Sequence, residues 1–445
     1  MLPFARPGGA QAATREFSLT AAPARINLVG TRYPDTDVWA YNGELPGPTL
    51  RLWQGERLRL RFINRLPQES TIHWHGIRLP NAMDGVPHLT QPPVPSGGEF
   101  LYEFDLPDAG TFWYHPHASS SGQVGRGLYG ALIVEERVPA AVHRELLWVL
   151  SDMRLDRDAR IDGGFGNPGD ASHGGRVGNS VLLNGRVAEQ VEVRPGERLR
   201  LRLLNAANAR IFRLRFDGLD ARVVALDGHP VAPHDAGEGV VLGPGMRADL
   251  LLQAADQDGA RRVVSDDFYR NNAYRLVELV HAGERAPPLP PFAELAPNPV
   301  SEPDLTNPER VRLTLGGGAM SPQLMRLPPE ERGQLAARMR AGEIWTINDV
   351  AQRGHAHRPL FTFARGRSCV MEIVNDTAWH HPFHLHGVAF RVLSEARRPW
   401  RDTVLLDPRQ RAEIAFVADN PGDWMIHCHI LEHQESGMMA SMRIK

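Results

Sequence analysis

Four short strings in the chain concentrate side chains that bind metals. They are HWHG at 73–76, HPH at 115–117, HHPFHLHG at 380–387 and HCHILEHQESGMM at 427–439. Each string contains a His-x-His pair, and the last one carries a cysteine between its two histidines. Histidine is the commonest metal ligand, and a thiolate beside imidazoles selects soft, late transition metals. The strings therefore predict metal sites built from the two ends of the chain.

The spacing of the pairs predicts how the ligands face. On a β-strand, residues i and i+2 share a face and residue i+1 points to the other side. The eight histidines expected to line one cavity are His73, His75, His115, His117, His384, His386, His427 and His429. Cys428 lies between two of them, so its sulfur should point away from this cavity and bind a metal of its own. With His381, His433 and Met438 it completes the ligand set of a blue copper electron-transfer site.

Other interpretations of the histidines are weaker. A lone His-x-His pair is more often structural, but four pairs with a nearby cysteine and methionine favour copper over zinc, which prefers closed sets of four ligands richer in cysteine. His355 and His357 form a fifth pair that matches nothing elsewhere, and a substrate or extra metal site there stays open. We expect His380 to point away from the side chain of His381. The remaining histidines are expected to be structural or solvated: His88, His143, His173, His229, His234 and His281.

A repeat organises the chain around these strings. Three similar segments end in asparagine: QGERLRLRFIN at 54–64, PGERLRLRLLN at 195–205 and RGRSCVMEIVN at 365–375. In the first two, apolar and charged residues alternate with the period of a half-buried strand. Cys369 stands where the other copies have leucine, so we expect a buried core cysteine.

The repeat also relates the first and third strings to each other. His73 and His75 follow the asparagine of the first copy by nine and eleven residues, and His384 and His386 follow that of the third copy by the same offsets. The second copy has apolar residues at these positions. The chain is therefore expected to consist of three homologous β-rich domains, with metal ligands in the outer two.

Short strands separated by Gly/Pro turns predict an all-β chain of β-sandwiches. The expected domains are residues 1–138, 139–286 and 309–445, and the first and third of them hold the ligands. Residues 287–308, which contain eight prolines, are expected to form a stiff linker. One helix is expected near 329–340, with acidic residues early and arginines late.

Composition excludes several partners. The 445 residues include 50 basic and 52 acidic side chains, a net charge of −2, which does not suggest nucleic acid or an anionic membrane as partner. The sequence contains no run of eighteen apolar residues, so we expect no transmembrane helix. The first residues lack the long apolar core of a signal peptide, so we expect either a cytosolic protein or a mature form whose export signal has been removed.

With these motifs, the chain resembles the three-domain multicopper oxidases, a laccase-like family built from cupredoxin domains. The resemblance extends from about Asn42 to Met439 and includes all four strings. It implies three consecutive cupredoxin-like Greek-key β-sandwich domains and four copper ions, one of type 1, one of type 2 and two of type 3. It also implies a periplasmic or secreted protein, and we expect a monomer.

The family pattern implies a role for each ligand. His381, Cys428 and His433, with Met438 as axial ligand, resemble the type 1 set, and His73 and His384 match the type 2 ligands. The type 3 pair would be held by His75, His115, His117, His386, His427 and His429. In the family, a reducing substrate gives up electrons singly to type 1 copper. Cys428, His427 and His429 pass them to the other three coppers, where dioxygen is reduced to water.

The expected substrates are phenols or aromatic amines, because an axial methionine is expected to lower the type 1 potential and favour easily oxidised donors. The alternative is a metallo-oxidase that acts on Cu(I), Fe(II) or Mn(II) in metal tolerance. Against a dedicated cuprous oxidase, the region before the third repeat strand has only Met320, Met325 and Met339. The positions that carry acidic and methionine ligands in that branch are Thr377 and Trp379 here.

The acids expected near the copper cluster depart from the family in one place. Asp84, nine residues after His75, matches the family's carboxylate near the cluster. Gln434 stands where relatives often have a glutamate that supplies protons. Glu435 is adjacent, but we expect its side chain to point elsewhere. Asp84 is therefore predicted to be the one acid that delivers protons.

Overall fold

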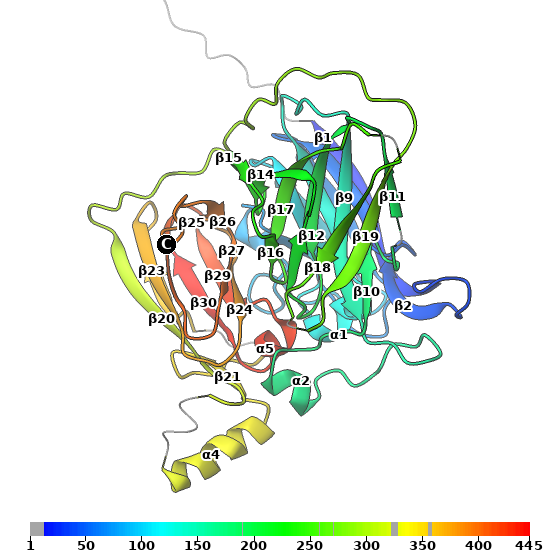
Figure 1. The fold of residues 1–445 in the computed structure, drawn as a ribbon. Coiled ribbons are helices and arrows are strands. Elements are labelled where there is room, and N and C mark those ends of the chain that lie inside the picture. The colour runs from blue at the N-terminus through cyan, green and yellow to red at the C-terminus, as the bar shows by residue number, and fades with distance from the viewer. Residues whose placement is uncertain (1–12, 189, 258, 270, 322–327, 355–357) are drawn as a thin grey trace, which may run out of the picture.

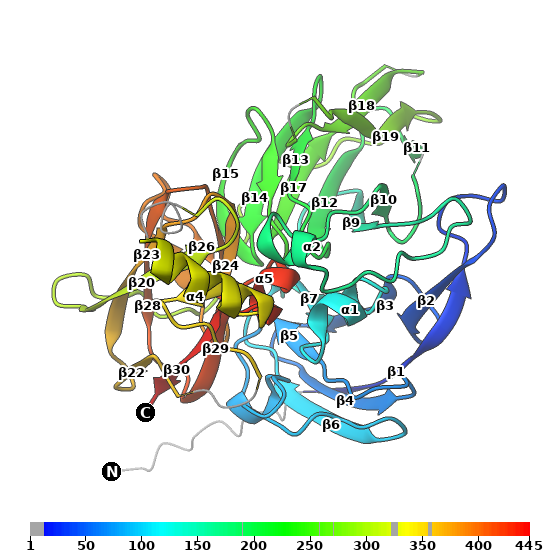
Figure 2. The ribbon, with the colours of Figure 1, turned by 90° about the horizontal axis from the view of Figure 1, so that it is seen from below.

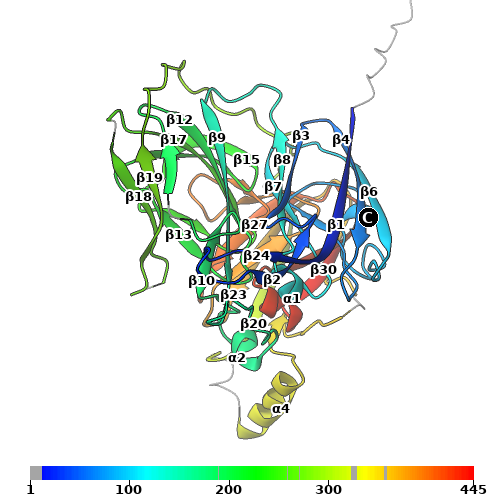
Figure 3. The same ribbon diagram turned by 90° about the vertical axis from the view of Figure 1, so that its right-hand side faces the viewer.

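The computed structural model describes residues 13–188, 190–257, 259–269, 271–321, 328–354 and 358–445. Within these residues, the strands form six sheets that face one another in three pairs. Figures 1 and 3 show the pairs following one another along the chain, from the blue N-terminal pair through the green pair to the orange and red C-terminal pair. The prediction of an all-β chain built from β-sandwiches is confirmed.

The first pair of sheets holds residues 14–135. One sheet has the order β2-β1-β4-β6, with β1 (Thr14–Ile26), β2 (Thr36–Tyr41), β4 (Arg57–Asn64) and β6 (Glu99–Asp105). The other has the order β3-β8-β7-β5, with β3 (Gly47–Trp53), β5 (His73–His75), β7 (Gly110–His115) and β8 (Gly130–Glu135).

The second pair holds residues 144–281. One sheet, β10-β9-β12-β17-β14-β15, contains β9 (Arg144–Met153), β10 (Ser180–Leu183), β12 (Arg198–Asn205), β14 (Asp220–Leu226), β15 (His229–Asp235) and β17 (Arg247–Gln253). The other, β11-β19-β18-β13-β16, contains β11 (Gln190–Val193), β13 (Phe212–Arg215), β16 (Val240–Leu242), β18 (Arg261–Asp266) and β19 (Tyr274–His281).

The third pair holds residues 309–444. One sheet, β21-β20-β23-β28-β25-β26, contains β20 (Glu309–Gly317), β21 (Trp345–Ile347), β23 (Ser368–Asn375), β25 (Phe390–Val392), β26 (Trp400–Arg401) and β28 (Arg411–Val417). The other, β22-β30-β29-β24-β27, contains β22 (Phe361–Phe363), β24 (His381–Leu385), β27 (Thr403–Leu406), β29 (Gly422–Cys428) and β30 (Met439–Ile444). The predicted limits at 138, 286 and 308 fall between these pairs of sheets and remain predictions.

The same strand pairing recurs in the three sandwiches. A parallel pair lies in one sheet of each, namely β1 with β4, β9 with β12, and β20 with β23. The second strand of each pair is the repeat segment that ends in asparagine. Each asparagine side chain is buried and holds the turn that follows, because its oxygen accepts from the amide two residues on and its Nδ2 donates to two carbonyls. The asparagines are Asn64, Asn205 and Asn375.

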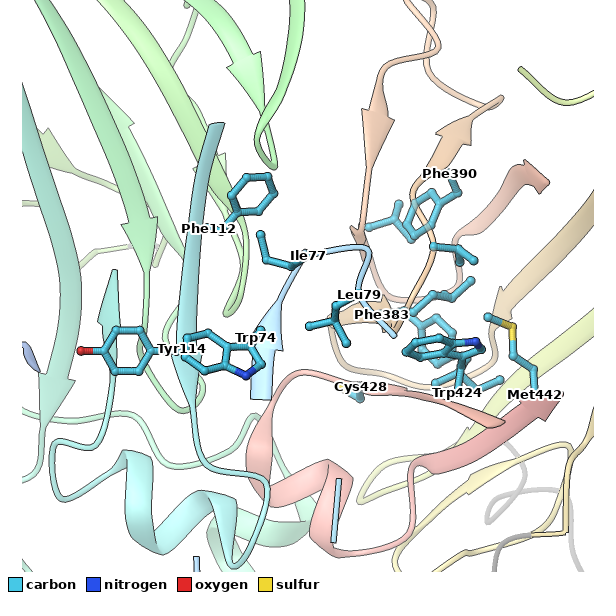
Figure 4. Close-up of a cluster of buried hydrophobic side chains, with 14 of the residues drawn as sticks. Trp74, Ile77, Leu79, Phe112, Tyr114, Phe383, Phe390, Trp424, Cys428 and Met442 are labelled. Atoms are coloured by element: carbon cyan, nitrogen blue, oxygen red, sulfur yellow. The ribbon is translucent and has the colours of Figure 1, made fainter. Parts of the chain in front are cut away.

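The alternating residues of the repeat strands form the cores. Leu58, Leu60 and Phe62 are fully buried, and Cys369 occupies the matching place in the third sandwich. Cys369 is fully buried in the apolar core, so the core prediction for this cysteine is confirmed, and burial raises the pKa of its thiol to about 12. Figure 4 shows that one apolar cluster continues from Trp74 of the first sandwich to residues around Cys428 of the third. The two outer sandwiches are therefore packed directly against each other.

The described helices are few and short. They are η1 (Asn81–Met83), α1 (Ser120–Val124), α2 (Pro168–Ser172), α4 (Pro329–Arg340) and α5 (Leu431–Glu435). α4 covers the predicted range, with Glu330 and Glu331 in its first turn and Arg338 and Arg340 in its last. No helix of the described residues is long and apolar enough to cross a bilayer. α5 lies where the three sandwiches meet (Figure 2).

Candidate metal centre

Two strand pairs bring the outer motifs together. β5 runs antiparallel to β7, which places His73 opposite His115. In the third sandwich, β24 runs antiparallel to β29, which places His384 opposite His427. The ends of these strands lie near one another in the middle of the molecule (Figure 2). Histidines from both ends of the sequence consequently share one interior space.

The eight histidines predicted to line one cavity lie together in one buried cluster, here named the eight-histidine cavity. Each is buried, and the rings of the first and third sandwiches interleave. His75 stacks on His384 with ring centroids 3.7 Å apart, and His73 stacks on His386 at 3.9 Å. The group is therefore a single cluster that neither sandwich could form alone.

The secondary structure under the pairs differs from the expectation. Of the four described pairs, only His73 and His75 lie wholly within one strand. β7 ends at His115 because Pro116, which has no amide hydrogen to donate to a ladder, follows it. β24 and β29 likewise end one residue before the second histidine of their pairs. The rings still lie side by side, with centroids 5.5 Å apart for His115 and His117 and also for His427 and His429.

Two aspartates orient four of the imidazoles in a reciprocal way. The carbonyl of Asp84 accepts from Nδ1 of His73 (2.8 Å), and its carboxylate Oδ2 lies 2.9 Å from Nδ1 of His386 in the other sandwich. The carbonyl of Asp402 accepts from Nδ1 of His384 (2.8 Å), and its carboxylate Oδ1 lies 3.0 Å from Nε2 of His75. Each aspartate thus orients one histidine of its own sandwich and one of the other.

These hydrogen bonds leave nitrogen lone pairs directed at each other. Nε2 of His386 and Nε2 of His427 are 3.0 Å apart. Both rings place Nδ1 against oxygen acceptors, the Asp84 carboxylate and the Cys428 carbonyl. With both protons on Nδ1, the two Nε2 atoms are acceptors that cannot bond each other. A cation bound by both Nε2 atoms would remove the repulsion between their lone pairs.

Further ring nitrogens in the cluster are buried without a hydrogen-bond partner in the described structure. They are Nε2 of His73, His115, His117 and His384, Nδ1 of His75, and both nitrogens of His429. A buried polar atom without a partner is unfavourable by about 1–3 kcal/mol, so seven of them in one cavity indicate ligands of metal ions. The donor set fits copper, which favours imidazole.

Burial and crowding keep these imidazoles uncharged. Burial lowers the pKa of seven of them below 6.5, and neighbouring imidazoles lower it further. The seven are His75, His115, His117, His384, His386, His427 and His429. Neutral imidazole is the form that binds metals, so the cavity favours the binding form at ordinary pH.

The second predicted site lies on the opposite side of β29. Sγ of Cys428 lies 3.3 Å from Nδ1 of His381 and 3.7 Å from Nδ1 of His433, and the two nitrogens are 3.2 Å apart. Nε2 of His381 bonds the hydroxyl of Thr377, which directs Nδ1 of His381 at the sulfur. Met438 is buried beside them, with its carbonyl accepting from the amide of Cys428. Cys428 thus points away from the eight-histidine cavity, as predicted.

Burial raises the pKa of the Cys428 thiol well above its usual range. A bare site would therefore hold a neutral thiol, and a metal ion would stabilise the thiolate. Five groups of three ligand atoms lie within 4.8 Å of one another among the described residues. Four of these groups belong to the eight-histidine cavity, and the fifth is His381, Cys428 and His433.

Sequence reasoning missed Asp402 and its partner Arg247, because no motif or repeat points to them. Arg247 comes from the second sandwich and donates to both carboxylate oxygens of Asp402, at 2.8 and 2.6 Å. Burial alone would raise the pKa of the Asp402 carboxyl, but Arg247 and His75 hold it well below 3.8. Asp84 follows His75 by nine residues whereas Asp402 follows His386 by sixteen, so the repeat could not relate the two acids.

The expectation for Glu435 is wrong. It lines a cavity of about 730 Å³ together with His117 and Gln434, and its carboxylate accepts from the amide and hydroxyl of Ser121. Residues 431–435 form α5, where successive side chains are about 100° apart around the axis and not on opposite faces as in a strand. Burial raises the pKa of the Glu435 carboxyl. The amide of Gln434 lies 3.3 Å from Nδ1 of His117.

Three further expectations have different outcomes. His380 does turn away from His381, and its ring lies beside Phe268 and 3.4 Å from a carboxylate oxygen of Asp407. His355 and His357 lie outside the described residues. His173, expected to be structural or solvated, has an exposed ring, while its carbonyl accepts from Nε2 of His433 at 2.6 Å.

Comparisons with known proteins agree with this site. Family models described as multicopper oxidase match residues 24–139, 160–282 and 326–445. The multicopper oxidase MmcO of Mycobacterium tuberculosis is 31% identical, over 98% of this chain and 87% of its own length. The chain belongs to the multicopper oxidase family. It is therefore a copper-dependent oxidoreductase built from three cupredoxin domains.

Three other relatives indicate how varied the family is. The crystal structure of a multicopper oxidase from Pseudomonas thermotolerans has 37% identity and a TM-score of 0.87, covering 98% of this chain and 100% of that one. Laccase-1 of Botryotinia fuckeliana is 28% identical over 89% of this chain and 77% of its own. A metallo-oxidase from Campylobacter jejuni has 27% identity and a TM-score of 0.80, covering 97% and 92%.

Proposed function

We propose that this multicopper oxidase is laccase-like: it oxidises phenols or aromatic amines by one electron at a time and reduces dioxygen to two waters. The observation that carries the proposal is the position of Cys428. Its sulfur belongs to one group of ligand atoms, while the adjacent His427 and His429 belong to the other. A short covalent path through this one residue connects the two groups, as an oxidase that separates substrate from dioxygen requires.

The proposed cofactors are four copper ions. His381, Cys428, His433 and axial Met438 would hold type 1 copper, and His73 with His384 would hold type 2. Six further histidines would hold the type 3 pair: His75, His115, His117, His386, His427 and His429. The unpaired ring nitrogens support this assignment. When bound, copper supplies one-electron redox chemistry and a binding place for dioxygen.

Two aspartates beside the cluster would have different roles. Asp402, paired with Arg247, carries a fixed negative charge that orients His75 and His384. Asp84 lies against His73 and His386 and has no arginine partner in the described structure, so its Oδ2 is the atom we propose to hold a proton for dioxygen reduction. Asp84 would thus be catalytic, and Asp402 a positioning residue.

The surroundings of the sulfur site favour organic donors over Cu(I). Thr377 uses its hydroxyl on His381, and the indole NH of Trp379 donates to the carbonyl of Ala319. Neither residue offers the carboxylate or thioether that a metal substrate would bind. Met320 is exposed, but Met325 lies outside the described residues. The metallo-oxidase from Campylobacter jejuni keeps the oxidation of metal ions open as the second candidate.

A turnover comparison on fully loaded protein tests the proposal. Hydroquinone and Cu(I) would be supplied separately, and oxygen uptake measured over the same concentration range. We expect faster uptake with hydroquinone. Faster uptake with Cu(I), saturating at low micromolar concentration, would show that a metal ion is the substrate instead. We further propose a monomer that acts in the periplasm or outside the cell, and sedimentation would test the first part.

A further inference from the structure

His433 is closed off from solvent by a segment of another sandwich. It is fully buried, and its Nε2–H donates to the carbonyl oxygen of His173 at 2.6 Å. Residues 167–176, here named the cover segment, include α2 and belong to the second sandwich. The one His433 nitrogen that does not face Cys428 therefore faces backbone, so a donor cannot touch this imidazole directly.

The cover segment is held firmly on the third sandwich. The indole NH of Trp345 donates to the carbonyl of Ala171 at 2.6 Å, and the amide of Ala319 donates to the carbonyl of Ser172 at 2.7 Å. Trp345 also packs against the ring of His433, with centroids 4.1 Å apart. These bonds hold the carbonyls of Ala171 and Ser172 against the third sandwich. The segment that covers His433 is therefore part of the native packing.

The same segment is also fixed to its own sandwich and to α5 of the third sandwich. Arg154 donates to both carboxylate oxygens of Asp170, each at 2.8 Å, and the amide of Arg176 donates to Glu432 of α5 at 3.1 Å. Gly175 has φ +82°, and a Cβ there would lie 2.5 Å from Ala209. The cover segment is thus tightly packed between the second sandwich and α5, with no room for a side chain at Gly175.

The outer side of the cover segment presents two aromatic rings. The imidazole of His173 is exposed and meets the half-buried indole of Trp379 edge-to-face, with centroids 5.3 Å apart. The indole is fixed by its bond to the carbonyl of Ala319. The two rings therefore form a rigid aromatic surface, one hydrogen bond away from His433 through the backbone of His173.

We propose that aromatic reductants dock on the His173–Trp379 surface and not on His433, with the cover segment as the barrier between them. This rests on the laccase-like function proposed above and identifies its docking place. Planar rings suit such a surface because offset and edge-to-face arrangements of aromatic rings are favourable. Each docked phenol loses one electron and its hydroxyl proton, and four such losses balance the reduction of one dioxygen to two waters.

Chemical modification tests the closure without using activity. Copper-free protein would be treated with diethyl pyrocarbonate, which acylates accessible imidazoles, and modified histidines mapped by mass spectrometry. We expect rapid modification of His173 and none of His433 in the folded protein. Modification of His433 at a rate similar to that of His173 would refute the barrier.

Anaerobic reduction tests the docking surface. The loaded protein would be mixed with hydroquinone without oxygen, and loss of the blue colour followed by stopped flow. Trp379→Ala and His173→Ala should each slow the loss by about fivefold, the effect expected when an aromatic contact is removed. Trp53→Ala, which changes an exposed tryptophan of the first sandwich, is the matched control and should leave the rate unchanged.

The outcomes separate the two proposals. If hydroquinone does not bleach the wild-type protein at all, the laccase-like function fails. If it does, and both surface variants bleach at the wild-type rate, the docking surface is wrong and the function stands. If only the reaction with Cu(I) slows in these variants, the surface serves a metal ion, which also overturns the proposal. His173→Ala retains the carbonyl that caps His433, so its effect reports on the ring alone.

Discussion

Cys428 illustrates how one residue serves two groups of ligands. Its side chain lies with His381 and His433, whereas its carbonyl accepts from Nδ1 of the adjacent His427. The second contact keeps the proton of His427 on Nδ1 and away from Nε2, the nitrogen proposed to bind copper. The residue would thus shape the proposed electron path, and its carbonyl also sets the tautomer of His427 in the neighbouring cavity.

Cys428→Ser should abolish the blue colour and the oxidation of hydroquinone, because a serine hydroxyl does not supply the thiolate on which the colour depends. Copper in the eight-histidine cavity should be retained, as measured by metal analysis. Cys369→Ser is the matched control, since that cysteine is buried in the core of the same sandwich. A blue Cys428→Ser protein would contradict the assignment.

Asp84→Asn should slow reoxidation of the reduced enzyme at least tenfold, about 1.4 kcal/mol of barrier, because the amide keeps the contacts but cannot hold a transferable proton. Stopped-flow mixing with oxygen measures the rate. Gln434→Glu should speed the same reaction, most clearly above neutral pH.

Substitution of Glu435 tests whether Asp84 is the only acid that delivers protons. If Asp84 is the single acid, Glu435→Gln should reoxidise at the wild-type rate. A loss in Glu435→Gln, with an unchanged rate in Asp84→Asn at full copper loading, would move proton delivery to the 730 Å³ cavity that Glu435 lines.

At the level of elements, the buried asparagine that ends each repeat strand holds the turn that follows it. In the second sandwich Asn205 donates to the carbonyls of Arg210 and Leu242 and accepts from the amide of Ala207. In the third, Asn375 donates to the carbonyl of Trp379 and accepts from Thr377, whose hydroxyl orients His381. The same turn is therefore structural in one sandwich and supports ligands in the other.

Asn205→Ala should lower the free energy of unfolding by about 3 kcal/mol, because buried backbone groups lose their partners, and should leave copper content unchanged. Asn375→Ala should lower stability by a similar amount and also weaken the blue band. Chemical denaturation and metal analysis of both variants check this. Equal loss of colour in the two variants would show that the turn acts only through overall stability.

At the scale of the whole molecule, the eight-histidine cavity exists only because the outer sandwiches meet. Asp84 bonds a histidine of the third sandwich, Asp402 bonds one of the first, and Arg247 of the second holds Asp402. Assembly of the three sandwiches and formation of the metal centre are therefore coupled, and metal should stabilise the entire chain.

The copper-free protein should lose stability steeply as the pH falls below about 6.5. The folded-state pKa values of the buried imidazoles lie below 6.5, so the unfolded chain binds more protons in that range and unfolding is favoured. Above 6.5 both states are neutral and the effect vanishes. Each such histidine contributes about 1.4 kcal/mol per pH unit. Thermal unfolding measured between pH 5 and pH 8 tests this, and a flat profile would contradict it.

The sequence alone determined the β-sandwich class and which residue types gather in two buried groups. It could do so because strand alternation and the constant offsets from Asn64 and Asn375 are local properties of the chain. The same local reasoning predicted that Cys428 points away from its neighbours. It failed for Glu435, which lies in a short helix and lines a cavity together with Gln434.

Only the tertiary structure decided which residues orient and enclose the ligands. Asp402 and His75 are 327 positions apart, and His173 and His433 are 260 apart. Asp402 follows its histidine pair at a different distance from Asp84, so no spacing rule joins the two acids. The bond from His433 to His173 uses a backbone carbonyl, which every residue type carries. Such contacts depend on how three sandwiches pack, and that packing leaves no pattern in the sequence.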